Sequence, residues 1–127
     1  YKSDNKLYTS SYPYADYGYG YRDAYYAFDN NNATFWASEI RKDEFLEIDF
    51  GEYLSVSKMM INGAEAVNVK YSVMGYDGKN WTKLYSGTAV KQGENLVVLS
   101  GKKVSKVRLV FSESKTGIVK INEMYVD

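Results

Sequence analysis

The chain contains no cysteine and no histidine. Without thiols or imidazoles it lacks the means for disulfide formation, thiol chemistry, the usual zinc sites and histidine-based acid–base catalysis. No Gly-rich run precedes a Lys-Ser or Lys-Thr pair, so a phosphate-binding loop of the P-loop type is also absent. The lack of cysteine is compatible with a Gram-positive secreted protein and equally with a cytosolic one.

Neither sign of charge dominates, and no long hydrophobic run is present. Lys+Arg number 16 and Asp+Glu number 16, for a formal net charge of zero. This balance argues against a nucleic-acid partner, which needs a basic surface. No stretch approaches the roughly 20 apolar residues of a membrane span. We expect residues 1–127 to form a single domain, and the first residue, a tyrosine without a leader-like segment, suggests a piece of a larger protein.

Most of the sequence carries strand signals. Residues 44–50 alternate, with Leu46, Ile48 and Phe50 on one face, and Gly51 is expected to end the strand. Further strands are expected over residues 56–61, 67–74, 81–85, 96–99, 104–111 and 118–126, and a turn of helix over 23–28. Short strands spaced about 8–12 residues apart predict an all-β antiparallel sandwich or barrel. The predicted core includes Phe45, Leu46, Ile48, Val107, Leu109 and Ile121.

The segment 27–36 gathers oxygen-bearing side chains next to a large aromatic residue. Asp29 offers a carboxylate, Asn31 an amide oxygen and Thr34 a hydroxyl. Hard cations such as Ca²⁺ are bound by mixed oxygen ligands of this kind. The alternative is a solvated, Asn-rich loop in which Asp29 caps a turn, because Asn and Asp favour turns in any case.

Several motifs occur in an order that resembles a known family. They are Thr9-Ser-Ser11, Ala27-Phe-Asp29, Thr34-Phe-Trp36, residues 45–51, Val56-Ser-Lys58, Tyr71-Ser-Val73, residues 77–81, Val107-Arg-Leu-Val110 and Ile121-Asn-Glu-Met124. This succession resembles the factor V/VIII type C domain, or discoidin domain, whose bacterial relatives are the family 32 carbohydrate-binding modules. The resemblance covers nearly the whole chain. It implies a galactose-binding-domain-like, eight-stranded antiparallel jelly-roll β-sandwich, with Trp36 and Trp81 in its core.

The resemblance also implies a structural Ca²⁺. The ligands that it carries over are the side chains of Asp29, Asn31, Thr34 and Glu123, with backbone carbonyls of Thr34, Tyr26 and Asn122. Such a site would join the loop over residues 26–34 to the last strand. The family usually has glycine after this aspartate, where the present chain has Asn30. Asn tolerates a positive φ better than most residues, so the turn is expected to survive.

In this family, loops at one end of the sandwich bind ligands. Nine of the 14 tyrosines lie in residues 1–26, and glycines separate several of them in the loop over residues 11–22. Rings on such a flexible segment can turn outward and stack on sugar faces. The candidate ligand-binding residues are therefore Tyr14, Tyr17, Tyr19, Tyr21, Arg22, Glu39, Arg41 and Asn68. The alternative is that the tyrosines pack over the end of the sandwich and bind nothing.

These features predict a non-catalytic carbohydrate-binding module that attaches a larger secreted or cell-surface bacterial protein to glycans. Galactose-binding relatives use a histidine, a residue type absent from this chain, and an arginine in a loop that corresponds to residues 62–67, where this chain has none, so the sugar stays open. The alternative function is a structural or protein-interaction module that keeps the fold without a sugar pocket. No carboxylate pair stands out as catalytic, so an enzyme is not expected. Membrane binding is not expected either, and nothing predicts more than a monomer.

Overall fold

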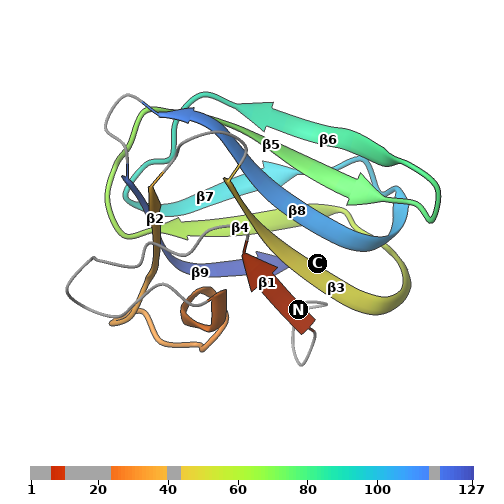
Figure 1. Ribbon diagram of the computed structural model, residues 1–127, viewed down its shortest axis with the longest axis horizontal. Helices are drawn as coiled ribbons and strands as arrows, with labels where there is room; N and C mark the ends of the chain where they lie inside the picture. The colour runs from red at the N-terminus through yellow and green to blue at the C-terminus, as the bar shows by residue number, and fades with distance from the viewer. Residues whose placement is uncertain (1–6, 11–23, 40–43, 115–117) are drawn as a thin grey trace.

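Two antiparallel sheets pack face to face in the structure, a computed structural model that describes residues 7–10, 24–39, 44–114 and 118–127 (Figure 1). The five-stranded sheet has the order β1 (Leu7–Ser10), β3 (Glu44–Ser55), β8 (Lys103–Ser114), β5 (Val69–Tyr76), β6 (Trp81–Gly87). The four-stranded sheet has the order β2 (Trp36–Glu39), β9 (Ile118–Val126), β4 (Lys58–Gly63), β7 (Gly93–Val98). A short 3₁₀ helix, η1 (Ala24–Ala27), precedes β2.

The architecture confirms the predicted antiparallel sandwich. The described residues form nine strands, one more than the eight that the family resemblance implies. η1 falls within the predicted helical turn over residues 23–28. No helix in the described part of the chain is long and apolar enough to cross a membrane.

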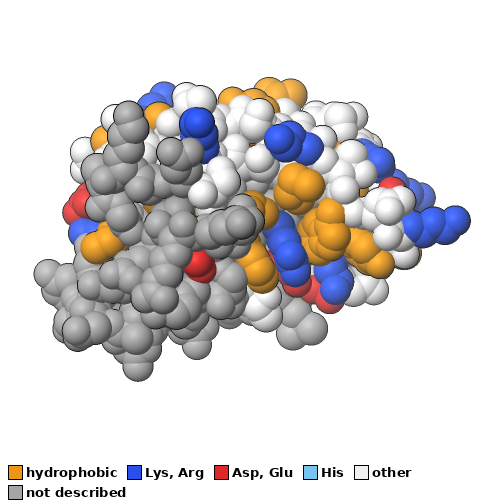
Figure 2. Space-filling view, turned by 45° about the horizontal axis from the view of Figure 1, so that its top comes forward, with side chains coloured by type: hydrophobic (Ala, Val, Ile, Leu, Met, Phe, Trp, Pro, Cys, Tyr) orange, Lys and Arg blue, Asp and Glu red, His pale blue; other side chains and the backbone are white. Residues whose placement is uncertain are grey.

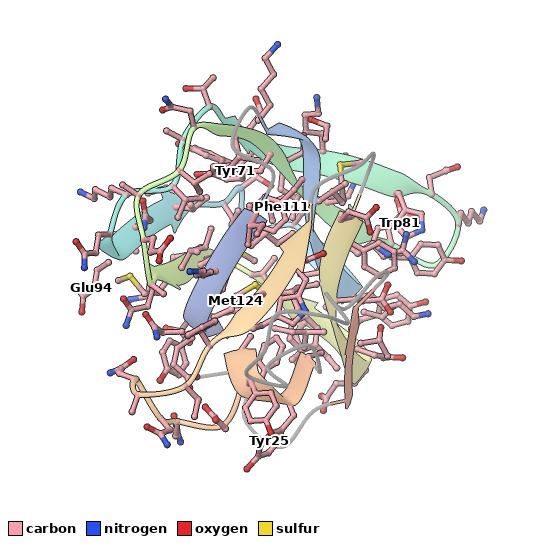
Figure 3. The ribbon with its side chains drawn as sticks, turned by 60° about the vertical axis from the view of Figure 1, so that its left-hand side comes forward. Tyr25, Tyr71, Trp81, Glu94, Phe111 and Met124 are labelled. Atoms are coloured by element: carbon pink, nitrogen blue, oxygen red, sulfur yellow. The ribbon has the colours of Figure 1, made fainter. Side chains whose placement is uncertain are left out.

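The core lies between the sheets, where alternating side chains from both meet. The rings of Trp36 and Phe111 stack with their centroids 6.2 Å apart. Figure 3 shows Phe111 and Met124 between the two layers. Of the predicted core residues, those with no exposed surface are Trp36, Leu46, Ile48, Val107, Leu109 and Ile121.

Two predicted core residues, Phe45 and Trp81, instead lie on the outer face of the five-stranded sheet. Phe45 directly precedes the buried Leu46, and neighbouring residues of a strand point to opposite faces. Trp81 pairs with Tyr76, and the two rings lie 5.2 Å apart outside the core. Figure 3 shows Trp81 away from the interior. The predictions for Phe45 and Trp81 were therefore wrong, since both rings lie outside the core and are only partly buried.

The prediction that Gly51 ends its strand was also wrong, because β3 continues to Ser55. The register between β3 and β8 shifts between Asp49 and Leu54, so an irregularity interrupts the pairing there. Gly51 has a φ of 71°, a conformation that glycine adopts without strain. The carboxylate of Asp49 accepts a hydrogen bond from the Gly51 N–H at 2.9 Å.

One end of the sandwich collects several of the connections between strands. The register pairs Ser10 with Leu46 and Val69 with Ser114. The last residues of β1, β6 and β8 therefore lie beside the first residues of β3 and β5. In the other sheet, the last residues of β2 and β4 lie beside the first residues of β9 and β7. The connections after β1, β2, β4, β6 and β8 thus all leave from this end. We call the described part of this end, residues 64–68 and 88–92, the apical rim. The segments 11–23, 40–43 and 115–117, which continue the chain after β1, β2 and β8, lie outside the described residues.

Candidate functional site

The loop over residues 28–35 folds into a compact turn held by its own side chains. The N–H of Asn31 donates to Asp29 Oδ1 at 3.1 Å. The Thr34 hydroxyl lies 2.5 Å from Asp29 Oδ2 and 3.0 Å from the carbonyl oxygen of Asn31. Asn and Asp side chains favour local backbone contacts of this kind. The loop is therefore built around the carboxylate of Asp29.

Asn30 has a φ of 58°, so the turn after Asp29 needs a left-handed residue. Among the described non-glycine residues, Asn30 alone has a positive φ. Asparagine adopts this region more readily than most side-chain-bearing residues. The expectation that the turn survives the replacement of glycine by Asn30 is confirmed.

Side chains from β9 and β4 bind this loop to the four-stranded sheet. The Asn122 amide donates to the carbonyl oxygens of Thr34 at 2.8 Å and Asn32 at 3.1 Å. Asn62 Nδ2 donates to the side chain of Asn32 at 2.8 Å. The Tyr125 hydroxyl donates to Asn30 Oδ1 at 3.1 Å. The loop and β9, separated by about 90 residues of chain, therefore form one unit.

Glu123 lies beneath this loop, with 1% of its surface exposed. Its Oε1 accepts the N–H of Asn31 at 2.9 Å, whereas its Oε2 is buried and has no hydrogen-bond partner in the described structure. Burial, with a smaller contribution from the neighbouring Asp29, raises the pKa of Glu123 to about 8 against the lowering effect of the Asn31 N–H. Two carboxylates that share such a site require a proton or a cation between them.

The structure thus brings together five of the six predicted metal ligands: Asp29, Asn31, Thr34, Asn122 and Glu123. Tyr26 lies in η1, which packs against β9. The Asn31 amide oxygen accepts the N–H of Ala33 at 2.9 Å, so this oxygen serves the loop itself. No group of three or more acidic side chains occurs among the described residues, so any cation here would depend on two carboxylates and neutral oxygens.

Most predicted ligand-binding residues fall outside the described part of the chain. Those residues are Tyr14, Tyr17, Tyr19, Tyr21, Arg22 and Arg41. Glu39 is the last residue of β2, and its side chain does not belong to the described part of the structure. Asn68 is exposed on the apical rim, between a bridge that pairs Val67 with Val90 and the start of β5.

Two features near the rim were missed from the sequence. The Lys120 ammonium lies 2.7 Å from Glu65 Oε1 and 5.5 Å from the centre of the Phe35 ring. Asn95 Nδ2 donates to the carbonyl oxygens of Lys91 at 2.9 Å and Gly93 at 3.0 Å, which shapes the segment before β7. The first feature depends on strand pairing, and the sequence gives no signal of it.

Comparison with known proteins adds to this geometry. The family described as F5/8 type C domain matches residues 6–124. No curated protein matches the chain significantly.

Among solved structures, chitosan-binding module 2 of a Paenibacillus sp. IK-5 chitosanase/glucanase, in complex with chitotriose, has a TM-score of 0.84 and 22% identity and covers 99% of this chain and 98% of its own. A Clostridium perfringens module, CpGH89CBM32-5 in complex with GalNAc-β-1,3-galactose, has a TM-score of 0.80 and 21% identity over 98% and 96%. The CBM32 of AlyQ, in complex with 4,5-unsaturated mannuronic acid, has a TM-score of 0.77 and 16% identity over 95% and 93%. At these identities the likeness shows the fold.

Proposed function

This chain belongs to the F5/8 type C domain family, and from that premise we propose that it is a non-catalytic carbohydrate-binding module. In this proposal it attaches a larger secreted or cell-surface protein to glycans. The supporting observation is the family match over residues 6–124 together with a fold shared by modules that bind oligosaccharides. The modest affinity of one such site is raised when the parent protein carries several.

The proposed glycan site combines the apical rim with the Tyr-rich segment that follows β1 in the sequence. Tyr17 and Tyr19 follow β1, whose last residue lies at this end of the sandwich. Aromatic rings stack on the apolar faces of sugars, while a few polar groups fix the sugar hydroxyls. The exposed side chain of Asn68 and the Lys120–Glu65 pair supply polar groups near the rim.

The second part of the proposal is a Ca²⁺ at Asp29 and Glu123. The donor set fits this ion, since Oε2 of Glu123 is buried without a hydrogen-bond partner and a second carboxylate lies beside it. Ca²⁺ takes six to eight oxygen ligands, which neutral oxygens of the loop would complete. These come from Asn31, Thr34, Tyr26 and Asn122. Bound there, the ion would neutralise both carboxylates and fasten the loop to β9.

Affinity electrophoresis through gels that contain soluble polysaccharides tests the glycan site. We expect at least one polysaccharide to retard the wild-type chain. Tyr17→Ala with Tyr19→Ala should then reduce the retardation at least tenfold, because the stacking surface is lost. Tyr53→Ala is the matched control, since Tyr53 is 51% exposed and lies at the opposite end of the sandwich.

Equal retardation of the double variant and the wild type would contradict the role of this segment. A circular-dichroism melt of each variant separates a lost contact from a lost fold. If the double variant unfolds, the tyrosines pack over the sandwich, and the segment is structural.

A further inference from the structure

A groove of about 320 Å³ crosses the outer face of the five-stranded sheet, away from the apical rim residues described above. This volume is at the small end of the range for ligand sites, roughly 300–1,000 Å³. Its lining combines apolar and polar side chains from β5, β6 and β8. These are Ser72, Met74, Trp81, Arg108, Val110 and Ser112.

Neighbouring side chains hold Arg108 in one position within this groove. Its guanidinium carbon lies 4.0 Å from the centre of the Phe45 ring and 4.4 Å from that of Trp81. Its Nε lies 2.6 Å from Oε1 of Glu47, the residue directly opposite it on β3. Figure 2 shows hydrophobic side chains on either side of a basic one on this face. Two rings and an ion pair therefore hold the guanidinium plane in place before any ligand arrives.

The contacts of Arg108 with described residues use Nε and the faces of the guanidinium, not the terminal nitrogens. Those nitrogens carry a fork of N–H donors that matches a carboxylate. Since the fork is already oriented, little further side-chain entropy is lost when an anion binds it.

The charges around the groove favour an anion. Lys83 lies opposite Met74 on β6, and Lys106 lies on β8 over the ring of Tyr76 at 5.7 Å. Glu47 is already paired with Arg108. Met74, Val110 and Trp81 offer apolar surface for the C–H face of a ring, and the hydroxyls of Ser72 and Ser112 suit sugar hydroxyls.

From this arrangement we propose that the groove is a second glycan site, which binds a uronic-acid unit through its carboxylate to Arg108. The site is distinct from the rim, because its lining lies on β5, β6 and β8 and includes no residue of 64–68 or 88–92. An acidic glycan would then contact the module at two places, at the rim and on the sheet.

Isothermal titration of the full chain tests the groove directly. The probes are oligosaccharides of galacturonic, glucuronic and mannuronic acid, each compared with its neutral hexose counterpart. We expect at least one uronate to bind at least tenfold more tightly than its neutral counterpart, with an affinity that falls as salt rises. Uniformly weak binding of every uronate would overturn the proposal.

Variants then locate the binding. Ser72→Glu adds a negative charge to the groove without touching the Arg108 contacts, and it should weaken uronate binding at least tenfold. Ser100→Glu makes the same charge change on an exposed loop residue outside the groove lining and should leave binding unchanged. Arg108→Lys keeps the charge but loses the fork and should also weaken binding, provided that its melt shows a folded domain.

These variants test the rim proposal and the groove proposal independently. Tyr17→Ala with Tyr19→Ala should leave binding of single uronic-acid units intact. If that variant abolishes uronate binding while Ser72→Glu does not, the acid binds at the rim and the groove proposal is wrong. Polyglutamate serves as a non-sugar anion, and tighter binding of polyglutamate than of any uronate would assign the groove to acidic peptides and overturn the proposal.

Discussion

At the residue scale, single side chains decide conformations that the strands alone leave open. Asn30 occupies a left-handed position, and Asp77 organises the turn between β5 and β6. Asp77 Oδ1 accepts the N–H groups of Lys79 at 2.9 Å and Asn80 at 2.8 Å. This turn leads directly into Trp81, so its rigidity supports one wall of the sheet groove.

Asp77 gives a pH-dependent prediction at this scale. The N–H groups of Asn80 and Lys79 lower the pKa of Asp77 below its ordinary value of 3.8. A carboxyl group whose folded pKa is lowered adds stability above its unfolded pKa and loses it as the pH falls through the folded pKa. Asp77→Asn should therefore lower the urea midpoint at pH 7, and the difference from wild type should shrink as the pH falls below 3.8.

Urea titrations of both proteins at several pH values check this. Glu94→Gln, which neutralises an exposed carboxylate on β7, is the matched control and should show no such trend. A difference between Asp77→Asn and wild type that stays constant down to pH 2.5 would contradict the role of the charge.

The limits of sequence reasoning are also clearest for individual residues. The period of two placed Leu46 and Ile48 correctly, because β3 is central and buried on one face. The burial of Trp81 was implied by the family resemblance and was wrong, since β6 is an edge strand whose pairing with β5 shifts register between Val73 and Met74. The register of β6 instead places the Trp81 ring on the outer face of the sheet.

At the scale of elements, the main feature is the union of the 28–35 loop with β9. Local residues suggested Asp29, Asn31 and Thr34 as oxygen donors, but Glu123 entered only through the family resemblance. The sequence alone could not pair them, because the contact depends on how β9 lies beside β4 and under the loop. The sheet groove was beyond prediction for the same reason, since its lining depends on the register of three strands.

Removal of the proposed cation should loosen this union. With a chelator present, the buried carboxylate of Glu123 and the neighbouring carboxylate of Asp29 repel each other, or Glu123 must take up a proton. Calcium at a hundredfold excess over its Kd should stabilise the wild type by about 2.7 kcal/mol. For a domain of this size that raises the melting temperature by roughly 10 °C.

Glu123→Gln isolates the charge in the same experiment. The variant should melt at or above the wild-type temperature in chelator, because a neutral amide replaces one of the two acids. Calcium should not raise the melting temperature of Glu123→Gln, whereas it should raise that of Glu94→Gln as much as that of the wild type. Identical wild-type melts with calcium and with chelator would remove the support for the cation.

At the scale of the whole molecule, the sandwich separates its surfaces by role. The core and the 28–35 loop fix the frame, the rim collects the connections between strands at one end, and the outer face of the five-stranded sheet presents Arg108 between two rings. The net charge is zero, and the basic side chains near Arg108 gather at one groove. This distribution favours selective binding at that groove over non-specific electrostatic binding across the whole surface.

Binding of the full chain to a glycan array, run beside anionic liposomes, tests the proposed function most directly. A carbohydrate-binding module should be retained on at least one class of glycan and should not bind the liposomes. Retention on no glycan would contradict the account: liposome binding would then indicate a lipid-surface module, and binding to neither would favour a structural or protein-interaction module.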